Sequence, residues 1–330
     1  MAINPKAIPY IILLVVFFAA LGITLICISN TEKFNNNNNI VTNNVWTRRG
    51  VFRQWNNLVR RMNDINIVMT PENTEFITMF GSQPGNNFSY VIYKNSNGKY
   101  GIMKRSSDNN NILIGNNIIL NQIDMTCFLG QGCVIYGNLG QNTPEMDTLI
   151  VPCSNGKIQF RNKNNLNILS TVTLTPSINN LRWVDMDSVT NHLLVPNSYQ
   201  NLTTIKAYQI NLNPYSFTFK VDIPLNIAVP NVVSGRVSYN GHLYFLSEDI
   251  VNNSAVISCY EIDVAFVNRQ PSRAILKQQF RIQLLNNEKA KSIYIDSARA
   301  LVFIFVVNNL NKRNVKILKY SLGVVGSANI

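Results

Sequence analysis

The sequence predicts an all-β fold in which a unit of four strands repeats along most of the chain. Three segments share the pattern Ile-x-x-Tyr-x-Ile/Leu, with one offset in the third, and are centred on Tyr208, Tyr260 and Tyr320. From about residue 65 onward, short apolar runs are separated by Asn, Gly and Pro, and no helical periodicity lasts more than a few turns. Self-similarity at a spacing of about 50–60 residues indicates a repeat architecture.

A pair of strand-like runs precedes each tyrosine segment and supplies the first two strands of each unit. These pairs are residues 181–185 with 192–195, 235–239 with 242–246, and 291–296 with 300–305. Between the second pair, Asn240-Gly241 is a strong hairpin signal, because both central positions of a type I′ turn need a positive φ. An amphipathic fourth strand is expected after the first two tyrosine segments, at residues 216–223 and 276–284.

Two weaker copies of the unit lie upstream. The first comprises residues 76–80, 90–94, 100–105 and 111–120, and the second comprises residues 123–129, 148–153, 158–161 and 168–174, with an insertion at 130–147. Four antiparallel strands per repeat resemble the blades of β-propeller proteins. The resemblance is one of fold, covers residues 63–330 and involves no family-specific motif. It implies five four-stranded blades.

The closure of such a ring is expected to use an N-terminal strand. The last unit has no fourth strand of its own, and the run 65–69 is left unassigned before the first blade. Because a propeller must join its first and last blades, we expect this run to complete the C-terminal sheet and to cover its edge. A six-bladed ring, with one blade in the insertion, and two stacked β-sandwich domains are the competing architectures.

A short tail, residues 1–7, precedes an uncharged apolar run of 21 residues at 8–28. A helix of this length spans the roughly 30 Å hydrocarbon core of a bilayer. A cleaved signal peptide is the alternative, but the run exceeds the usual ~7–15 apolar residues and no small-x-small site follows it. The sequence therefore predicts a signal anchor and a single-pass membrane protein. The nearest flanking charges favour a lumenal or external C-terminal domain, whereas Arg48 and Arg49 argue for the reverse.

Residues 29–44 are an Asn-rich stretch that we expect to form a flexible tether. Residues 45–62 are predicted to form a basic amphipathic juxtamembrane helix, since apolar residues recur there every three or four positions. Its indoles suit headgroup depth and its guanidinium groups suit anionic lipid. The residues assigned to this membrane interface are Trp46, Arg48, Arg49, Phe52, Arg53, Trp55, Arg60 and Arg61. Packing of the apolar stripe on the following domain is the alternative.

No catalytic set is recognisable in the sequence. His192 and His242 begin the second strands of successive units, and this equivalence in a repeat is explained by a structural role. Glycan hydrolysis in a propeller channel would need a pair of carboxyl groups, for which the candidates are Asp124, Asp185 and Asp296. The last two precede tight turns, where Asp stabilises the turn itself. We therefore assign no catalytic residue, no cofactor and no metal.

Two further patterns depend on the side of the membrane. Cys127 and Cys133 are spaced to close a small disulfide loop in an oxidising compartment, and free buried thiols are the alternative. Sequons of the form N-x-S/T are candidate glycosylation sites if the domain is lumenal or external, and they occur at Asn87, Asn201 and Asn253.

The formal net charge of +12 is compatible with nucleic acid binding, but five of the positive charges lie within the short stretch 48–61. The sequence therefore predicts a membrane-anchored β-propeller that acts as a binding or structural module for a protein or glycan partner. Its composition and single anchor are similar to those of virion membrane proteins of large DNA viruses. A glycan-processing enzyme that uses the propeller channel and a basic protein that bridges membrane and nucleic acid are the alternatives.

Overall fold

Strands run through most of the residues that the computed structural model describes. These residues are 56–61, 64–81, 88–106, 118–124, 129–135, 148–153, 156–187, 190–237, 241–264, 271–296 and 301–324. They belong to one unit of the chain, Trp46–Ile330, and the other unit is Met1–Val45. Within the described residues, no helix has the length and apolar character that crossing a membrane requires. The tail, anchor and tether expected at residues 1–44 lie outside the described part.

Groups of antiparallel strands follow one another along the chain, and the strands of a group pair in sequence order. The first two groups are β3 (Thr74–Gly81), β4 (Phe88–Asn95), β5 (Tyr100–Ser106) and β6 (Ile118–Asp124), then β7 (Cys133–Val134), β8 (Thr148–Pro152), β9 (Lys157–Asn162) and β10 (Ile168–Thr173). The next two are β11 (Asp185–Asp187), β12 (His192–Pro196), β13 (Asn201–Leu212) and β14 (Tyr215–Pro230), then β15 (Val232–Val237), β16 (Leu243–Asp249), β17 (Ser254–Val264) and β18 (Pro271–Gln283). The last contains β19 (Glu288–Asp296), β20 (Leu301–Asn308) and β21 (Asn311–Val324).

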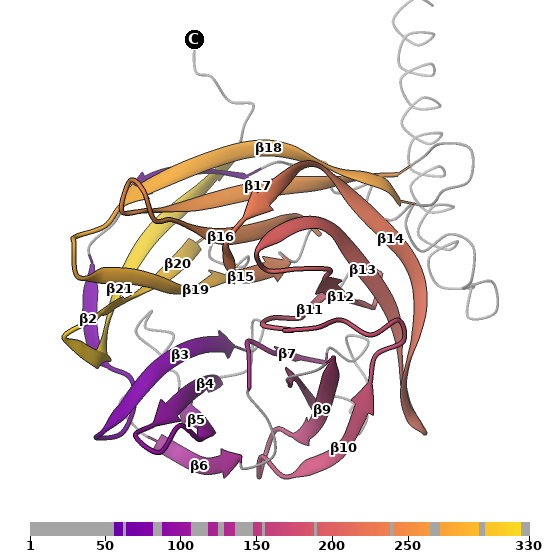
Figure 1. The fold of residues 1–330 in the computed structure, drawn as a ribbon, viewed down its shortest axis with the longest axis horizontal. Coiled ribbons are helices and arrows are strands. Elements are labelled where there is room, and N and C mark those ends of the chain that lie inside the picture. The colour runs from indigo at the N-terminus through magenta and orange to yellow at the C-terminus, as the bar shows by residue number, and fades with distance from the viewer. Residues whose placement is uncertain are drawn as a thin grey trace, which may run out of the picture. The chain divides into compact units, whose positions relative to one another are not determined.

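The first strands of these groups meet around a common centre (Figure 1). β3 contacts β7, β7 contacts β11, β11 contacts β15, β15 contacts β19, and β19 returns to β3. From the centre each group extends outwards strand by strand, so that β6, β10, β14 and β18 lie at the periphery. A closed circle of antiparallel groups is the architecture of a β-propeller, which confirms the fold that the sequence predicts.

An N-terminal strand completes the last group. β2 (Ile65–Val68) pairs antiparallel with β21, with Ile65 opposite Ile317 and Val68 opposite Asn314. The half-buried Ile65 and Ile67 pack against the hydrophobic core between the first and last groups. This is the pairing expected for the run 65–69, and it covers an edge of β21 that would otherwise leave backbone groups unpaired.

β1 (Asn56–Arg61) corrects the helix predicted over residues 45–62. It is a strand that also pairs antiparallel with β21, with Asn56 opposite Val324 and Arg61 opposite Tyr320. The open edge of β21 explains the difference, because its free N–H and C=O groups stabilise a strand, whereas a short isolated helix is marginal in water. Residues 45–55 and the β1 side chains, including those of Arg60 and Arg61, lie outside the described part.

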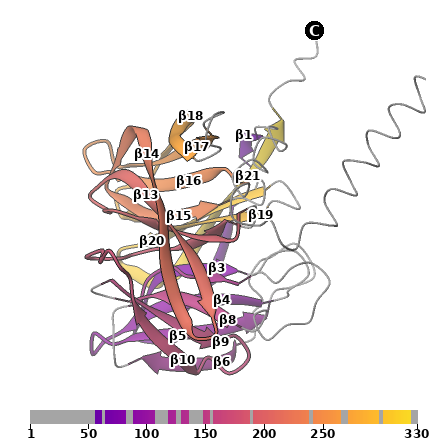
Figure 2. The same cartoon turned by 90° about the vertical axis from the view of Figure 1, so that its right-hand side faces the viewer.

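Each hydrophobic core cluster joins side chains from two consecutive groups, and the cluster shared by the first and last groups closes the circle. The long β13–β14 hairpin extends over the preceding group (Figure 2). There the rings of Tyr215 and Phe217 lie 4.8 and 5.0 Å from the ring of Phe160 on β9, measured between centroids. Most of the apolar side-chain burial that stabilises the domain therefore lies between neighbouring groups of strands.

The repeated tyrosines tie neighbouring groups together. Tyr208 on β13 donates a hydrogen bond of 3.1 Å to the carbonyl of Pro176, in the connection after β10. Tyr260 on β17 donates one of 2.7 Å to the carbonyl of Ile227 in β14. Tyr320 on β21 packs edge-on against a phenylalanine of β18. In each case the tyrosine contacts the preceding group of strands, so the repeated tyrosines lie at the contacts between neighbouring groups.

The second group differs from the sequence prediction at its inner strand. The prediction placed this strand at residues 123–129, whereas the structure has β7 at Cys133–Val134 and gives Ile118–Asp124 to the outer edge of the first group. The outer strand of the first group, which was expected at residues 111–120, therefore lies further along the chain, at Ile118–Asp124. A strand of two residues carries no alternating pattern, while the apolar run 118–124 has the length of an ordinary strand.

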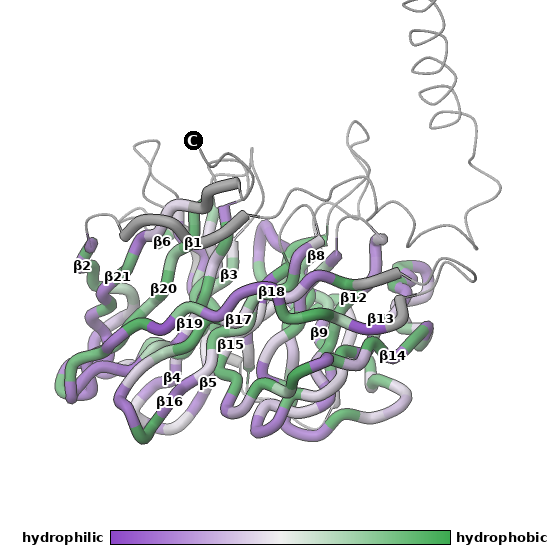
Figure 3. The backbone as a smooth tube through the Cα atoms, turned by 90° about the horizontal axis from the view of Figure 1, so that it is seen from above, coloured by the Kyte–Doolittle hydropathy of each residue, from purple (hydrophilic) through white to green (hydrophobic). Residues whose placement is uncertain are grey.

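The strands cross the ring between two faces, and both hydrophobic and hydrophilic residues occur along them (Figure 3). The face that carries the turns at residues 250–253, 284–287 and 309–310 is termed the turn face. The described chain begins at Asn56, which pairs with Val324 at the end of β21 opposite to the 309–310 turn. That opposite side is termed the entry face.

Candidate functional site

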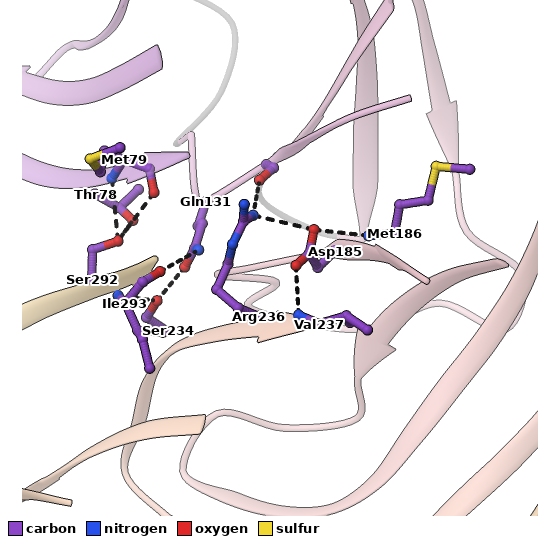
Figure 4. A network of polar contacts seen from close by, with 11 residues as sticks. Thr78, Met79, Gln131, Asp185, Met186, Ser234, Arg236, Val237, Ser292 and Ile293 are labelled. Carbon is purple, nitrogen blue, oxygen red and sulfur yellow. Dashed lines mark hydrogen bonds and ion pairs between the residues drawn. The ribbon is translucent and has the colours of Figure 1, made fainter. Parts of the chain in front are cut away.

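Buried polar side chains join the inner strands at the centre of the ring (Figure 4). Gln131, Asp185, Ser234, Arg236 and Ser292 are at most 5% exposed. They come from β11, β15 and β19 and from the segment that precedes β7. Because these elements are far apart in the sequence, their polar groups meet only when the ring is closed.

Asp185 and Arg236 form a buried ion pair between β11 and β15. Arg236 Nη1 lies 3.2 Å from Asp185 Oδ1, and the Val237 N–H donates to Oδ2 at 2.7 Å. The Met186 N–H donates to Oδ1 at 2.9 Å. The Arg236 guanidinium also lies over the ring of Tyr294 on β19, 5.4 Å from its centroid. One arginine therefore connects three inner strands.

A second set of hydrogen bonds runs from Gln131 to β3. Ser234 Oγ donates to Gln131 Oε1 and accepts the Ile293 N–H at 3.0 Å. Gln131 Nε2 in turn donates to the Ile293 carbonyl at 3.4 Å. Ser292 Oγ accepts the Thr78 hydroxyl at 2.9 Å and donates to a β3 carbonyl at 3.2 Å. Donors and acceptors of the inner strands are thereby paired with one another.

Burial shifts the pKa values of the ionisable groups at this centre. Burial raises the pKa of Asp185, while Arg236 and two backbone N–H groups oppose that rise. Its two carboxylate oxygens accept three hydrogen bonds from within the network. Burial also raises the pKa of the Cys133 thiol well above its usual range, and the charge of Asp185 adds to this shift. A thiol in this state is a poor nucleophile.

The three acidic residues considered for glycan chemistry lie on different elements. Asp185 belongs to the central network, Asp296 ends β19, and Asp124 ends β6. β6 is the fourth strand from the centre, and strands lie about 4.8 Å apart, so the Asp124 backbone is ~14 Å from the inner strand of its group. The expectation that Asp124 lies beside a first strand is therefore wrong, because its backbone belongs to the outermost strand of the first group.

The histidines occupy equivalent buried positions, as expected from the repeat. His192 begins β12, with its Nδ1 2.8 Å from the Thr190 carbonyl oxygen, and His242 immediately precedes β16. Among the residues that the structure describes, no cluster of three His, Cys, Asp or Glu side chains is placed to hold a metal ion.

The cysteines differ from the spacing-based prediction. Cys133 is a free thiol, so the predicted Cys127–Cys133 disulfide is wrong. The reason is the direction of the side chain, since Cys133 packs in the core between the second and third groups. Cys259 is also free and buried. Cys153 is disulfide-bonded, whereas Cys127 lies outside the described residues.

Only some of the other predicted sites lie within the described residues. Asn201 begins β13 and is exposed, whereas the side-chain amide of Asn253 donates a 3.1 Å hydrogen bond to the Leu284 carbonyl. Asn87 lies outside the described residues. So do the membrane-interface residues upstream of β1: Trp46, Arg48, Arg49, Phe52, Arg53 and Trp55.

The turn face carries exposed aliphatic side chains at the tips of neighbouring turns. Ile250 and Val251, in the β16–β17 turn, are 76% and 93% exposed. Leu285, in the β18–β19 connection, is 67% exposed, and Leu310, in the β20–β21 turn, is 82% exposed. These four residues are termed the aliphatic ridge.

Hydrogen bonds between the turns hold the ridge together. The Leu284 N–H donates to the Asn253 carbonyl at 3.1 Å, and the Asn309 N–H donates to the Asn287 carbonyl at 2.7 Å. The first bond links the β16–β17 turn to the β18–β19 connection, and the second links that connection to the β20–β21 turn. The ridge is therefore a continuous feature that crosses two groups of strands.

A pocket of about 490 Å³ adjoins the ridge where the first and last groups meet, and is termed the seam pocket. Its walls come from the β2–β3, β4–β5 and β20–β21 turns, and Leu310 lines it. Its charged lining residues are Lys94, Lys312, Arg313 and Glu75. A second pocket, of about 350 Å³, lies between β2 and the ends of β19, β20 and β21. Both pockets border the β20–β21 turn.

Sequence reasoning missed Thr78, Ser234 and Ser292, although a signal was present. Each follows an irregularity in the strand register, on β3, β15 and β19 respectively. A β-bulge re-aims the next side chain, which here points into the central network. Hydroxyl residues at equivalent places in successive repeats would have indicated these contacts.

Comparisons with known proteins concern the fold. No protein-family model matches the chain, and no curated protein matches it. The structure is similar to glutaminyl cyclase from Myxococcus xanthus, at 9% identity and a TM-score of 0.46, over 83% of this chain and 98% of that chain. It is also similar to the β-propeller domain of Cps50 (Swd1) from Myceliophteria thermophila, at 8% identity and a TM-score of 0.45, over 80% and 99% of the two chains. At these levels neither likeness says what the chain does or whether it is an enzyme.

Proposed function

We propose that the chain is a single-pass membrane protein whose five-bladed β-propeller is a binding module for a macromolecular partner. The observation that carries the proposal is the contrast between centre and surface. The central polar groups are paired with one another, whereas the turn face presents an aliphatic ridge and a charged pocket on tightly bonded turns. Exposed apolar residues that gather on rigid turns are typical of interaction sites.

The number of five blades is supported by the inner strands. β3, β7, β11, β15 and β19 contact one another in a circle, and each begins a group that extends outwards. A sixth blade would need about four more strands of five to six residues each. The stretch between β7 and β8 has too few residues for them.

The anchor and its orientation are supported by two features. The uncharged run at residues 8–28 is long enough to span a bilayer as a helix. The disulfide at Cys153 supports an external or lumenal domain, because disulfides persist in oxidising compartments. In such a compartment the exposed Asn201 is available for glycosylation.

The test of the anchor uses the full chain expressed in cultured cells. We expect the protein to remain in the membrane pellet after alkaline extraction, and the propeller to resist protease in sealed microsomes until detergent is added. A glycosidase should shift the mobility of the wild type, and the Asn201→Gln variant should lose the part of this shift that belongs to that site. Release into the soluble fraction would overturn the anchor, and digestion in sealed vesicles would overturn the orientation.

The test of binding compares positions on the same chain. A photo-crosslinking amino acid replaces Val251 on the turn face or Lys220 on the peripheral strand β14, and crosslinked products are identified from intact cells. We expect a recurrent product from the Val251 position that the Lys220 position does not give. Equal products from both positions would contradict a dedicated binding face.

A further inference from the structure

We propose that the aliphatic ridge and the seam pocket together bind an extended acidic segment of a partner protein. Aliphatic side chains of that segment contact the ridge, and its carboxylates enter the pocket. The inference rests on the proposed function, in which the propeller is a binding module, and specifies its binding face and the chemistry of its partner.

The two features form one surface because Leu310 belongs to both. Its side chain is 82% exposed at the end of the ridge and also lines the seam pocket. Beyond it, the pocket is walled by turns of the first group, including Lys94 at the end of β4. A chain lying along the turn face would thus pass from the apolar tips of Val251 and Leu285 to the pocket without interruption.

The charges of the pocket favour an anionic ligand. Lys94 lies opposite Glu75 in the β3–β4 ladder but forms no ion pair within the described residues, and its ammonium group lies 5.9 Å from the centroid of the Tyr100 ring. Lys312 Nζ lies 3.4 Å from Glu75 Oε2, on the only acidic side chain that lines the described pocket. Arg313 is 3.7 Å from Glu72, which is 83% exposed and can release it. Cations therefore exceed carboxylates where the ligand would bind.

Two acidic groups beside the ridge, Asp249 and Glu288, are already engaged in ion pairs, which weakens their repulsion of such a ligand. Asp249, next to Ile250, is paired with Arg281 and accepts a hydrogen bond from the side chain of Asn252. These contacts lower the pKa of Asp249 below its usual range. Glu288, which follows the β18–β19 connection, lies 3.2 Å from Lys316.

An acidic peptide fits this surface better than a glycan. The large exposed hydrophobic residues of the described chain are aliphatic, whereas sugars stack on aromatic rings. A bilayer would also suit apolar tips and cations, so anionic vesicles are tested beside the peptide.

The experiment measures binding to the full-length protein in detergent micelles by fluorescence anisotropy. The probe is a fluorescein-labelled peptide that repeats Leu-Glu-Glu, and the comparison peptides replace Glu by Gln or Leu by Ser. We expect the Leu-Glu-Glu peptide to bind at least about tenfold more tightly than either comparison peptide, and more weakly as salt is raised.

Matched variants locate the site. Lys94→Glu and Leu310→Ser should each weaken binding of the Leu-Glu-Glu peptide about tenfold. Lys220→Glu on β14 and Ile168→Ser on β10 change exposed residues of the same types at the periphery, and should leave binding within about twofold. Because the four positions are exposed or partly exposed, thermal unfolding of three variants should match the wild type. Lys94→Glu places a second carboxylate opposite Glu75 in the β3–β4 ladder and should unfold slightly earlier.

Two results would overturn the inference. One is equal binding of the peptide to the pocket and peripheral variants. The other is tighter binding of heparin oligosaccharides or of anionic phosphatidylglycerol vesicles that depends on Lys94 and Leu310. Either result leaves the membrane anchor intact, because alkaline extraction tests the anchor separately, so failure of this inference is distinguishable from failure of the anchor.

Discussion

Arg236 lies where three inner strands meet, and its position shows what the buried polar residues do. Its guanidinium pairs with Asp185 on β11 and covers the ring of Tyr294 on β19. Taking two charges out of water is costly, so a buried ion pair stabilises a fold less than its Coulomb energy suggests. Removing one partner is worse, because the other charge stays buried without compensation. The main effect of the Asp185–Arg236 pair is therefore to specify which strands meet, and its net contribution to the free energy of unfolding is smaller.

Substitutions of Asp185 and Arg236 are therefore expected to be strongly non-additive in a double-mutant cycle. Arg236→Met should lower the free energy of unfolding by about 3–5 kcal/mol, and the Asp185→Asn/Arg236→Met double variant should recover at least half of that loss. Denaturant unfolding of the full-length protein, followed by the fluorescence of the buried Trp183, measures both. The control is Arg281→Met, which removes a more exposed pair with Asp249 and should cost no more than about 1 kcal/mol. Additive losses in the cycle would show that the two side chains act separately.

The buried hydroxyl groups of Tyr208 and Tyr260 predict how the free energy of unfolding changes at alkaline pH. Burial raises the pKa of Tyr208 and of Tyr260 to about 12, from an ordinary value of 10. The folded state thus prefers the protonated phenol, so this contribution is complete below pH 10 and is lost as the pH rises towards 12. Tyr260→Phe removes the titrating group together with its hydrogen bond to Ile227, at a cost of about 1 kcal/mol.

Thermal unfolding of wild type and Tyr260→Phe should therefore converge between pH 10 and pH 12. Other titrating groups are shared by the two proteins and cancel in the difference. A constant difference across this range would mean that the Tyr260 hydroxyl does not stay protonated in the folded state.

At the scale of the element, β2 depends on the edge that it covers. The Met69 N–H donates to the Arg313 carbonyl at 3.0 Å, and the register continues without a shift to Ile67 opposite Val315. In an antiparallel ladder, hydrogen-bonded pairs alternate with non-bonded ones. The N–H of Ile67 therefore points to β21, and the N–H of Asn66 points away from it.

Proline at these two positions should have different effects. Ile67→Pro removes a ladder hydrogen bond and should lower the free energy of unfolding clearly more than Ile67→Ala, by about 1–3 kcal/mol. Asn66→Pro keeps the ladder bonds, since proline is tolerated where a strand's N–H faces away from its partner, and should cost less. Chemical denaturation of the full chain measures the three variants. Equal losses for both prolines would show that β2 does not hold the ring closed.

Elements with a clear pattern were predictable from sequence, and those defined by a neighbouring edge were not. The apolar runs of β16, β17 and β20 and the unassigned run that became β2 carried enough information for type and order. β7 has two residues and β1 has a helix-like sequence, and both are strands because a partner offers hydrogen bonds. The central network was hidden for a similar reason, because Gln131 and Ser234 become neighbours only in the closed ring.

At the scale of the whole molecule, the circular arrangement of cores makes the groups depend on one another. Cys133 packs in the core between the second and third groups, and Cys259 packs in the core between the fourth and last groups. Burial raises the pKa of both thiols, so both should react slowly in the folded protein. If loss of one core opens the ring, the remaining cores lose a neighbour and unfold in the same transition.

We therefore expect both thiols to become reactive at the same denaturant concentration, which should also be the midpoint of Trp183 fluorescence. The disulfide at Cys153 takes two of the five cysteines, so the denatured chain should accept three labels before reduction and five after it. Cys133→Ala and Cys259→Ala assign the labels by peptide mass. A ring whose cores are shared cannot open between two groups and keep the other contacts closed. Reaction of Cys133 at a clearly lower denaturant concentration than Cys259 would contradict this, because it would show that the second and third groups open alone.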